Sequence, residues 1–373
     1  MPIKQNFPIT PMGSYPPEDV TFLLKDLSGV IEERGTEDRE EAIQSGVHYS
    51  EMLPIEYKPT SEYMEVYQKA LVEYAEKLAV AIGVVAEEIL AKKGRNLILV
   101  SLARAGTPIG ILIKRYLSFA YNLDAPHYSV SIIRGKGIDE QAIRYIKENH
   151  PDSQIQFIDG WTGKGAISRE LTQACQNMND KFGYHLDDSL AVLADPGHCS
   201  EIYGTREDFL IPSACLNSTV SGLVSRTVHN KAYISDQDFH GAKYYRHLEE
   251  EDVSNEFIAT IVKEFPRAGR DIQTQLDKIR SEHTIPNWSG AACVKKIQVD
   301  FLIDDINHVK PGVGETTRVL LRRVPWKILV KDRYDERLKH IILLAKDRGV
   351  PIEEYKDMTY TCCGLIKSLR KKL

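Results

Sequence analysis

The sequence predicts an α/β protein with a parallel sheet, followed by a small basic C-terminal domain of the same class. One observation is a recurring order in which a short apolar run, a glycine-containing loop and a helical pattern repeat about every 30 residues. This spacing is typical of right-handed βαβ units. The other is a change of charge: residues 290–373 hold 18 Lys and Arg against 11 Asp and Glu, whereas the residues before them hold 30 against 42.

The first 60 residues are predicted to be an irregular extension, because seven prolines interrupt them. One short helix is expected at 19–27. Residues 61–93 are predicted to form one long helix, which Ser61 can cap and Gly94 ends. The N-terminus has no apolar signal region, and the most apolar helical stretch carries two glutamates. We therefore expect a cytoplasmic protein with no membrane partner.

Four buried strands are expected in the body of the chain, at 96–102, 127–133, 153–158 and 189–194. Predicted helices at 109–117, 139–149 and 166–178 lie between or after them. The loops that follow the four strands read ARAGTP, RGKG, DGWTGKG and DPGHC. Ligands of parallel sheets bind at the carboxyl ends of the strands, so these loops are the candidate site.

The small residues around 287–292 indicate a boundary between domains at 1–289 and 290–373. In the second domain the pattern predicts an α/β/α sandwich. Its expected strands are 295–303, 326–332 and 350–355, and its expected helices are 316–323, 336–349 and 363–373.

The most chemically suggestive segment is 155–166, where an apolar strand runs into a glycine-rich turn and then a helix. Free backbone N–H groups at the start of a helix suit a phosphate group. Thr162 can add a hydroxyl donor and Lys164 a positive charge, while Asp159 can accept from sugar hydroxyls. The spacing of Gly160 and Gly163 disfavours the ATP-binding P-loop.

This turn resembles the phosphoribosyl-pyrophosphate (PRPP) loop of type I phosphoribosyltransferases. The segment 101–107 is similar to the pyrophosphate loop of that family, and 134–137 to its mobile basic loop. The resemblance implies a type I phosphoribosyltransferase-like domain, in which Mg²⁺, Arg104 and Lys136 neutralise departing pyrophosphate and Asp159 holds the ribose. The residues implied to bind substrate are Ala105, Gly106, Thr107, Arg134, Gly160, Trp161, Thr162, Gly163, Lys164 and Gly165.

In the C-terminal domain, residues 310–318 open a helix with two glycines that allow close approach to a phosphate backbone. The segment resembles the RNA-reading loop of the L7Ae/Pelota family. The RNA-binding residues so predicted are Gly312, Gly314, Glu315, Thr317, Arg318 and Arg322. A basic dimerisation domain, giving a homodimer, is the alternative.

The whole chain resembles a bacterial family found near tellurium-resistance and stress genes, carried by residues 46–52, 101–110, 159–165 and 203–227. That family is described as a phosphoribosyltransferase joined to a Pelota-type RNA-binding domain, and also as the StiP cysteine proteases. We therefore predict a PRPP-dependent transferase coupled to RNA binding.

Two alternatives stay open. One is a cysteine protease with Cys199 or Cys215 beside His198, His229 or His240, since a cysteine nucleophile needs a nearby base. The other is a non-catalytic RNA-binding adaptor, because Gly160 stands where most transferases have a second acidic residue.

Overall fold

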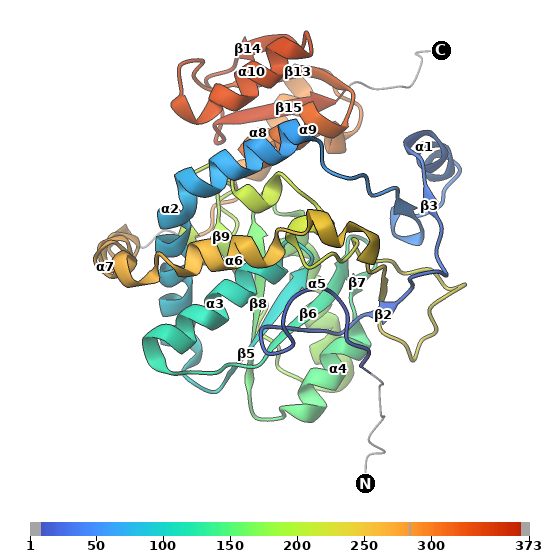
Figure 1. Ribbon diagram of the computed structural model, residues 1–373, viewed down its shortest axis with the longest axis vertical. Helices are drawn as coiled ribbons and strands as arrows, with labels where there is room; N and C mark the ends of the chain where they lie inside the picture. The colour runs from blue at the N-terminus through green and yellow to red at the C-terminus, as the bar shows by residue number, and fades with distance from the viewer. Residues whose placement is uncertain (1–8, 283–284, 367–373) are drawn as a thin grey trace.

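The computed structural model describes residues 9–282 and 285–366. A sheet of seven strands forms the centre of the larger domain (Figure 1). Its path is β1-β6-β5-β8-β9-β10, every pairing on it is parallel, and β7 pairs antiparallel with β6. The strands are β1 (Thr21–Phe22), β5 (Leu97–Ala103), β6 (His127–Ile133), β7 (Gly137–Ile138), β8 (Gln154–Trp161), β9 (Leu190–Ala194) and β10 (Ile202–Thr205). The four predicted strands are thus confirmed, as is the parallel sheet.

Helices cover both faces of this sheet. On one face lie α2 (Ser61–Lys93), α3 (Gly106–Tyr121), α6 (Ser254–Val262) and α7 (Phe265–Glu282); on the other lie α4 (Glu140–Asn149) and α5 (Ala166–Phe182). The long helix spans 61–93 as predicted, and Gly94 ends it with a φ of 69°. No helix within the described ranges is long and apolar enough to cross a membrane.

The N-terminal segment packs against both faces of the large sheet. The helix predicted at 19–27 is wrong. Phe22 and Leu24 pack into the core on one face of the sheet, whereas Leu23 packs into the core on the other. This alternation has the period of a strand, not of a helix. The smaller elements are β2 (Lys25–Asp26), β3 (Glu33–Arg34), α1 (Thr36–Gln44), η1 (Tyr49–Glu51), β4 (Leu53–Pro54), η2 (Pro212–Ala214), η3 (Ser218–Val220), β11 (Gly241–Ala242) and η4 (Arg246–Glu251).

The C-terminal domain contains a mixed four-stranded sheet with the order β12-β15-β13-β14. Only β13 and β14 pair in parallel. Its elements are α8 (Ser289–Asp300), η5 (Ile306–His308), β12 (Val309–Pro311), α9 (Val313–Arg322), β13 (Pro325–Val330), η6 (Glu336–Leu338), α10 (Lys339–Asp347), β14 (Ile352–Glu354) and β15 (Cys362–Ile366). The domain is therefore α/β, as predicted.

Two of its elements differ in type from the prediction, and β12 lies in a segment that was expected to be a loop. The strand expected at 295–303 is instead helix α8, because Cys293, Val294 and Ile297 share one buried face at helical spacing. The helix expected at 363–373 begins as β15, which lies between β12 and β13. Such a central strand is buried on both faces and carries no alternation. Residues 367–373 lie outside the described residues.

Candidate functional site

The loops at the carboxyl edge of the large sheet meet the C-terminal domain. The loop after β8 begins at Thr162, and the loop after β9 begins at Asp195. The hydroxyl of Tyr360 donates to the carbonyl of Gly163 at 3.0 Å. The N–H of Gly290 donates to the carbonyl of Gly197 at 3.1 Å. The edge that was expected to bind ligands is therefore covered by residues of the other domain.

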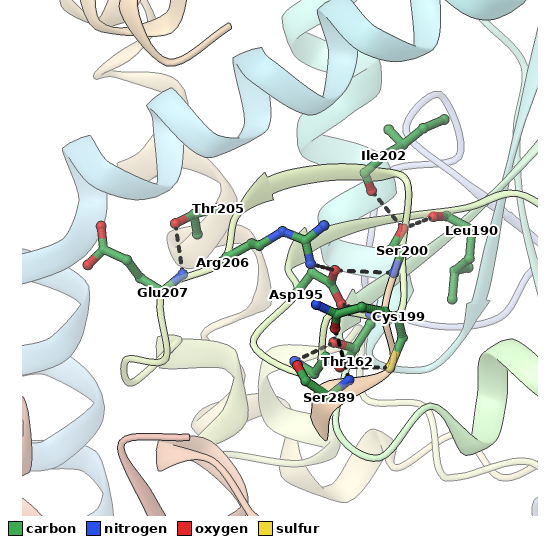
Figure 2. A network of polar contacts seen from close by, with 12 residues as sticks. Thr162, Leu190, Asp195, Cys199, Ser200, Ile202, Thr205, Arg206, Glu207 and Ser289 are labelled. Atoms are coloured by element: carbon green, nitrogen blue, oxygen red, sulfur yellow. Dashed lines mark hydrogen bonds and ion pairs between the residues drawn. The ribbon is translucent and has the colours of Figure 1, made fainter. Parts of the chain in front are cut away.

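Asp195 is the centre of the polar network at this edge (Figure 2). One carboxylate oxygen accepts from the Thr162 hydroxyl at 2.5 Å and from the Cys199 N–H at 2.8 Å. The other accepts from the Ser200 N–H at 3.1 Å and from the Arg206 guanidinium at 2.8 Å. Burial raises the pKa of Asp195, although these four donors oppose the shift. The carboxylate thus fixes the loop that carries Cys199 to the glycine turn.

Cys199 lies against this turn, and its side chain is buried. Its Sγ contacts the carbonyl oxygens of Gly197 at 3.2 Å and Gly163 at 3.8 Å. Burial, and then the charge of Asp195, raise the pKa of the thiol to about 12. Because only the thiolate is a strong nucleophile, Cys199 is unreactive in this closed arrangement.

The residue before it, His198, has a partly exposed side chain and a φ of 52°. Burial, and then the charge of Arg206, lower the pKa of its ring, so it is neutral at pH 7. Its backbone carbonyl accepts from the N–H of Trp288 at 3.0 Å. The indole of Trp288 lies over Gly165, where an added Cβ would come within 2.3 Å of the ring.

The glycine turn predicted to hold a phosphate borders a cavity of about 250 Å³. Asp159, Trp161, Thr162, Gly163, Lys164, Gly165 and Arg134 line it together with Lys310 and Glu315 of the C-terminal domain. The Asp159 carboxylate accepts from the N–H of Gly160 at 2.7 Å, and burial raises its pKa to about 7. Asp159 is therefore a partly protonated acid near neutral pH.

The basic residues predicted for the leaving group are dispersed. Lys136 makes an ion pair with Glu51 at 3.0 Å. Arg104 donates to the carbonyl of Val224 at 3.1 Å and lines a different, larger cavity. Among their neighbours, Ala105 and Gly106 pack close to the end of β8, and the hydroxyls of Thr107 and Ser129 are 2.8 Å apart.

Lys164 and Arg134 are bound by the C-terminal domain. Both donate to the side-chain oxygen of Asn307, at 2.9 and 3.2 Å, and Lys164 also donates to the carbonyl of Ile306. Burial, and then the nearby Lys310 and Arg134, lower the pKa of Lys164 to about 8. These contacts occupy the two basic groups that a PRPP phosphate was predicted to meet.

Most of the predicted RNA-binding residues face the larger domain. The Asp208 carboxylate accepts from the N–H groups of Val313 and Thr361, each at 2.8 Å. Gly312 approaches the same carboxylate, and Gly314 lies against Ala214 of the larger domain. Thr317 is fully buried and bonds to the carbonyl of Val313 at 2.8 Å.

The charged residues Glu315 and Arg318 of this segment are partly exposed. Arg318 bridges Glu315 at 3.1 Å and Asn217 of the larger domain at 3.0 Å. The side chain of Arg322 lies outside the described part of the structure. The loop predicted to read RNA therefore docks on the larger domain in this arrangement.

The histidines proposed for a protease are held elsewhere. His229 and His240 stack with ring centroids 4.5 Å apart, and His240 bonds to the Ser131 hydroxyl at 2.8 Å. Cys215 is fully buried in the main core. None of the six cysteines forms a disulfide. The described residues include no group of three or more His, Cys, Asp or Glu side chains that could hold a metal ion.

Sequence reasoning pointed to the loop after β9 but missed Asp195, Asp208 and Tyr360. Asp195 directly follows a buried strand, so the rule that selected Asp159 could also have selected it. Asp208 and Tyr360 carry no comparable signal, because their partners lie more than 100 residues away along the chain.

Comparison with known proteins overturns the predicted transferase. Residues 13–262 match the family described as "Tellurite-like stress resistance cysteine protease StiP". A protein of Acinetobacter baylyi named "Cysteine protease StiP" is 34% identical over 380 residues, covering 99% of this chain and 96% of its own length. A solved hypoxanthine-guanine-xanthine phosphoribosyltransferase is 16% identical and covers 34% of this chain and 63% of its own. Its TM-score of 0.18 is too low to carry an argument about activity.

The prediction of a PRPP-dependent phosphoribosyltransferase is therefore wrong. The catalytic roles predicted for Asp159, Arg104 and Lys136 were part of that reaction and are withdrawn with it. Mg²⁺ was expected only with PRPP and has no separate support. Residues 288–368 match the family described as "PELOTA RNA binding domain", in agreement with the L7Ae/Pelota resemblance. The chain belongs to the StiP family of tellurite-like stress resistance cysteine proteases, and it ends in a PELOTA domain.

Proposed function

We propose that this chain is a cysteine protease whose nucleophile is Cys199 and that its own C-terminal domain keeps it latent. The observation that supports this most is the position of Cys199 between the carboxyl edge of the sheet and the first residues of the C-terminal domain. Parallel sheets bind their ligands at this edge. The family to which the chain belongs supplies the reaction class.

The other cysteines are poorer candidates for a nucleophile. Cys175 packs from α5 onto the sheet, and Cys215 is fully enclosed in the main core. Cys293, Cys362 and Cys363 belong to the C-terminal domain and are buried there. Of the six, only Cys199 follows a strand of the large sheet at its ligand-binding edge.

In the reaction, the sulfur of Cys199 attacks the carbonyl carbon of a peptide bond after losing its proton to a base. The amine leaves with a proton, and water then hydrolyses the thioester. We assign the base to His198, the preceding residue in the chain, because its neutral ring at pH 7 is the form that can accept the proton. Asp195 acts as a positioning residue, since it holds the backbone of Cys199.

Latency follows from the same contacts. A thiol with a pKa of about 12 is almost fully protonated at pH 7, and it bonds to backbone carbonyls. Trp288, Gly290 and Tyr360 bind the carbonyls of His198, Gly197 and Gly163 on either side of it. Separation of the two domains would hydrate the thiol and lower its pKa.

The test uses the full chain and the substitution Gly290→Ala. A Cβ at this position would come within 2.1 Å of the Tyr360 hydroxyl and 2.6 Å of the Gly197 Cα, so it separates the domains locally. Cleavage of denatured casein and alkylation of Cys199 by iodoacetamide, located by mass spectrometry, should both rise in this variant.

Adding Cys199→Ser should abolish cleavage, whereas the matched control Cys175→Ser should retain it. Circular dichroism checks that each variant is folded. Casein cleavage that persists in the Gly290→Ala/Cys199→Ser chain would overturn the proposal.

We also propose that the C-terminal domain binds RNA when the domains separate. The match to the PELOTA domain and the basic charge of residues 290–373 support RNA as partner. Fluorescence anisotropy with a labelled RNA should show tighter binding for Gly290→Ala than for the wild type, and binding should weaken as salt rises. Within the Gly290→Ala chain, Arg318→Ala should weaken binding more than the exposed control Lys356→Ala. Equal binding by all four chains would contradict this role for the loop.

A further inference from the structure

A cavity with a volume of about 600 Å³ lies between the two domains. Its walls include Arg39, Arg104 and Arg226 of the larger domain and Lys310, Arg318 and Arg323 of the C-terminal domain. The volume is in the range of small-molecule binding sites. Neither Cys199 nor the loop around it is among the residues that line it.

The cavity has far more positive than negative charge among its described lining residues. Seven basic side chains line it, against only Glu56 and Glu315. Glu56 is already engaged by the N–H and hydroxyl of Ser218, at 3.1 and 2.9 Å. Glu315 pairs with Arg318, and the seventh basic residue, Lys58, pairs with Glu251 outside the cavity. The described lining of the cavity therefore holds more basic than acidic side chains.

The guanidinium of Arg226 shows the effect of the neighbouring positive charges on one side chain of the cavity. It donates to the carbonyls of Tyr49 and Met52, at 2.6 and 2.7 Å, and its Nε is buried without a partner in the described structure. Burial, and then the charges of Arg39, Arg104 and Arg323, lower its pKa to about 10. Like charges that line one partly desolvated cavity repel one another, and a bound anion would reduce that repulsion.

Arginine is the side chain best suited to a phosphate group, because its planar fork can donate two parallel hydrogen bonds. Five arginines converge here from segments that are far apart in the sequence. We propose that this cavity binds a compact anion with two or more phosphate groups and that both domains hold it jointly. The two sources of such an anion are a free polyphosphate compound and the phosphorylated end of an RNA chain.

Isothermal titration calorimetry of the full chain with sodium tripolyphosphate tests the site. Binding is expected in the wild type, and Arg39→Gln and Arg323→Gln should each weaken it about tenfold or more. Lys346→Gln removes an exposed positive charge on α10, away from the cavity, and should leave the affinity unchanged. Absence of binding, or equal affinity in all four chains, would overturn the proposal.

A short RNA with a 5′-triphosphate and the same RNA with a 5′-hydroxyl identify the source. If the RNA end is the ligand, only the triphosphorylated RNA should displace tripolyphosphate. If the ligand is a free compound, neither RNA should displace it. Displacement by both RNAs alike would mean that the cavity does not select clustered phosphates, which would contradict the proposal. None of these measurements depends on Cys199, so the peptidase proposal stands or fails separately.

Discussion

The substitution Asp195→Asn should destabilise the larger domain and release the loop that carries Cys199. An asparagine can keep one acceptor oxygen, so it can retain the hydrogen bonds from Thr162 and from the N–H of Cys199. Its amide nitrogen would then face the N–H of Ser200 and the guanidinium of Arg206, which are both donors. The substitution therefore exchanges two attractive contacts for two donor-to-donor contacts.

The magnitude follows from those two contacts. Hydrogen bonds to a charged group contribute about 1.5–3 kcal/mol each, so the loss is roughly 3–6 kcal/mol. The Asp195 carboxylate is fully buried, so little of this is recovered by water. Domains of this kind have a free energy of unfolding of about 5–15 kcal/mol, so a loss of this size is a large fraction of the total and is readily measured.

Urea unfolding, followed by tryptophan fluorescence, measures the loss directly. Hydrogen exchange of the Ser200 amide should also speed up, because this N–H bonds to Asp195 in the wild type and loses its acceptor in the variant. The control Asp180→Asn changes an exposed carboxylate and should stay within about 0.5 kcal/mol of wild type. If Asp195→Asn also stayed within that range, the network would not hold this loop.

Three further outcomes are expected. Burial raises the pKa of Asp208 from 3.8 to about 6, against the opposing Val313 and Thr361 donors. The folded chain therefore binds this proton more tightly than the unfolded chain, which adds about 3 kcal/mol of stability below about pH 4, and this contribution is lost as the pH rises through about 6. Urea unfolding, followed by the fluorescence of Trp288 in a chain whose other tryptophans are phenylalanine, should show that loss of stability, and Asp208→Asn should abolish its pH dependence. Gly165→Ala should lower the free energy of unfolding by roughly 1–3 kcal/mol more than Gly183→Ala does. Both glycines have a positive φ, but only at Gly165 would the added Cβ collide with Trp288 and Cys199. Equal losses in urea unfolding would refute this steric argument. Tyr360→Phe should raise the rate of Cys199 alkylation several-fold, because the loss of one neutral hydrogen bond weakens the docking of the two domains by about 1 kcal/mol. An unchanged rate would show that this contact does not close the site.

The sequence by itself determined the large parallel sheet and its long covering helix. The four apolar runs at 96–102, 127–133, 153–158 and 189–194 became β5, β6, β8 and β9, with ends that differ by at most a few residues. Helix α2 spans the predicted residues and ends at Gly94, although its N-cap is Thr60 and not Ser61. These features are local, because a buried strand needs only a short apolar run and a helix end needs only a suitable neighbour.

Elements whose burial depends on distant partners were misjudged. Residues 20–24 contact two cores on opposite faces of the sheet, and residues 362–366 lie between two strands. A short run of apolar residues is compatible with either helix or strand until its neighbours are known. The strand predicted at 295–303, where the structure has helix α8, is wrong for the same reason.

The candidate site was determined only in part by sequence. The rule that ligands bind at strand ends selects the loops at Thr162 and Asp195, because it depends on chain order alone. Only the tertiary structure decided that the C-terminal domain closes over Cys199, that Asp208 holds the loop predicted to read RNA, and that basic residues from both domains surround one cavity. Each of these depends on contacts between residues more than 100 positions apart, and no local pattern encodes such a distance.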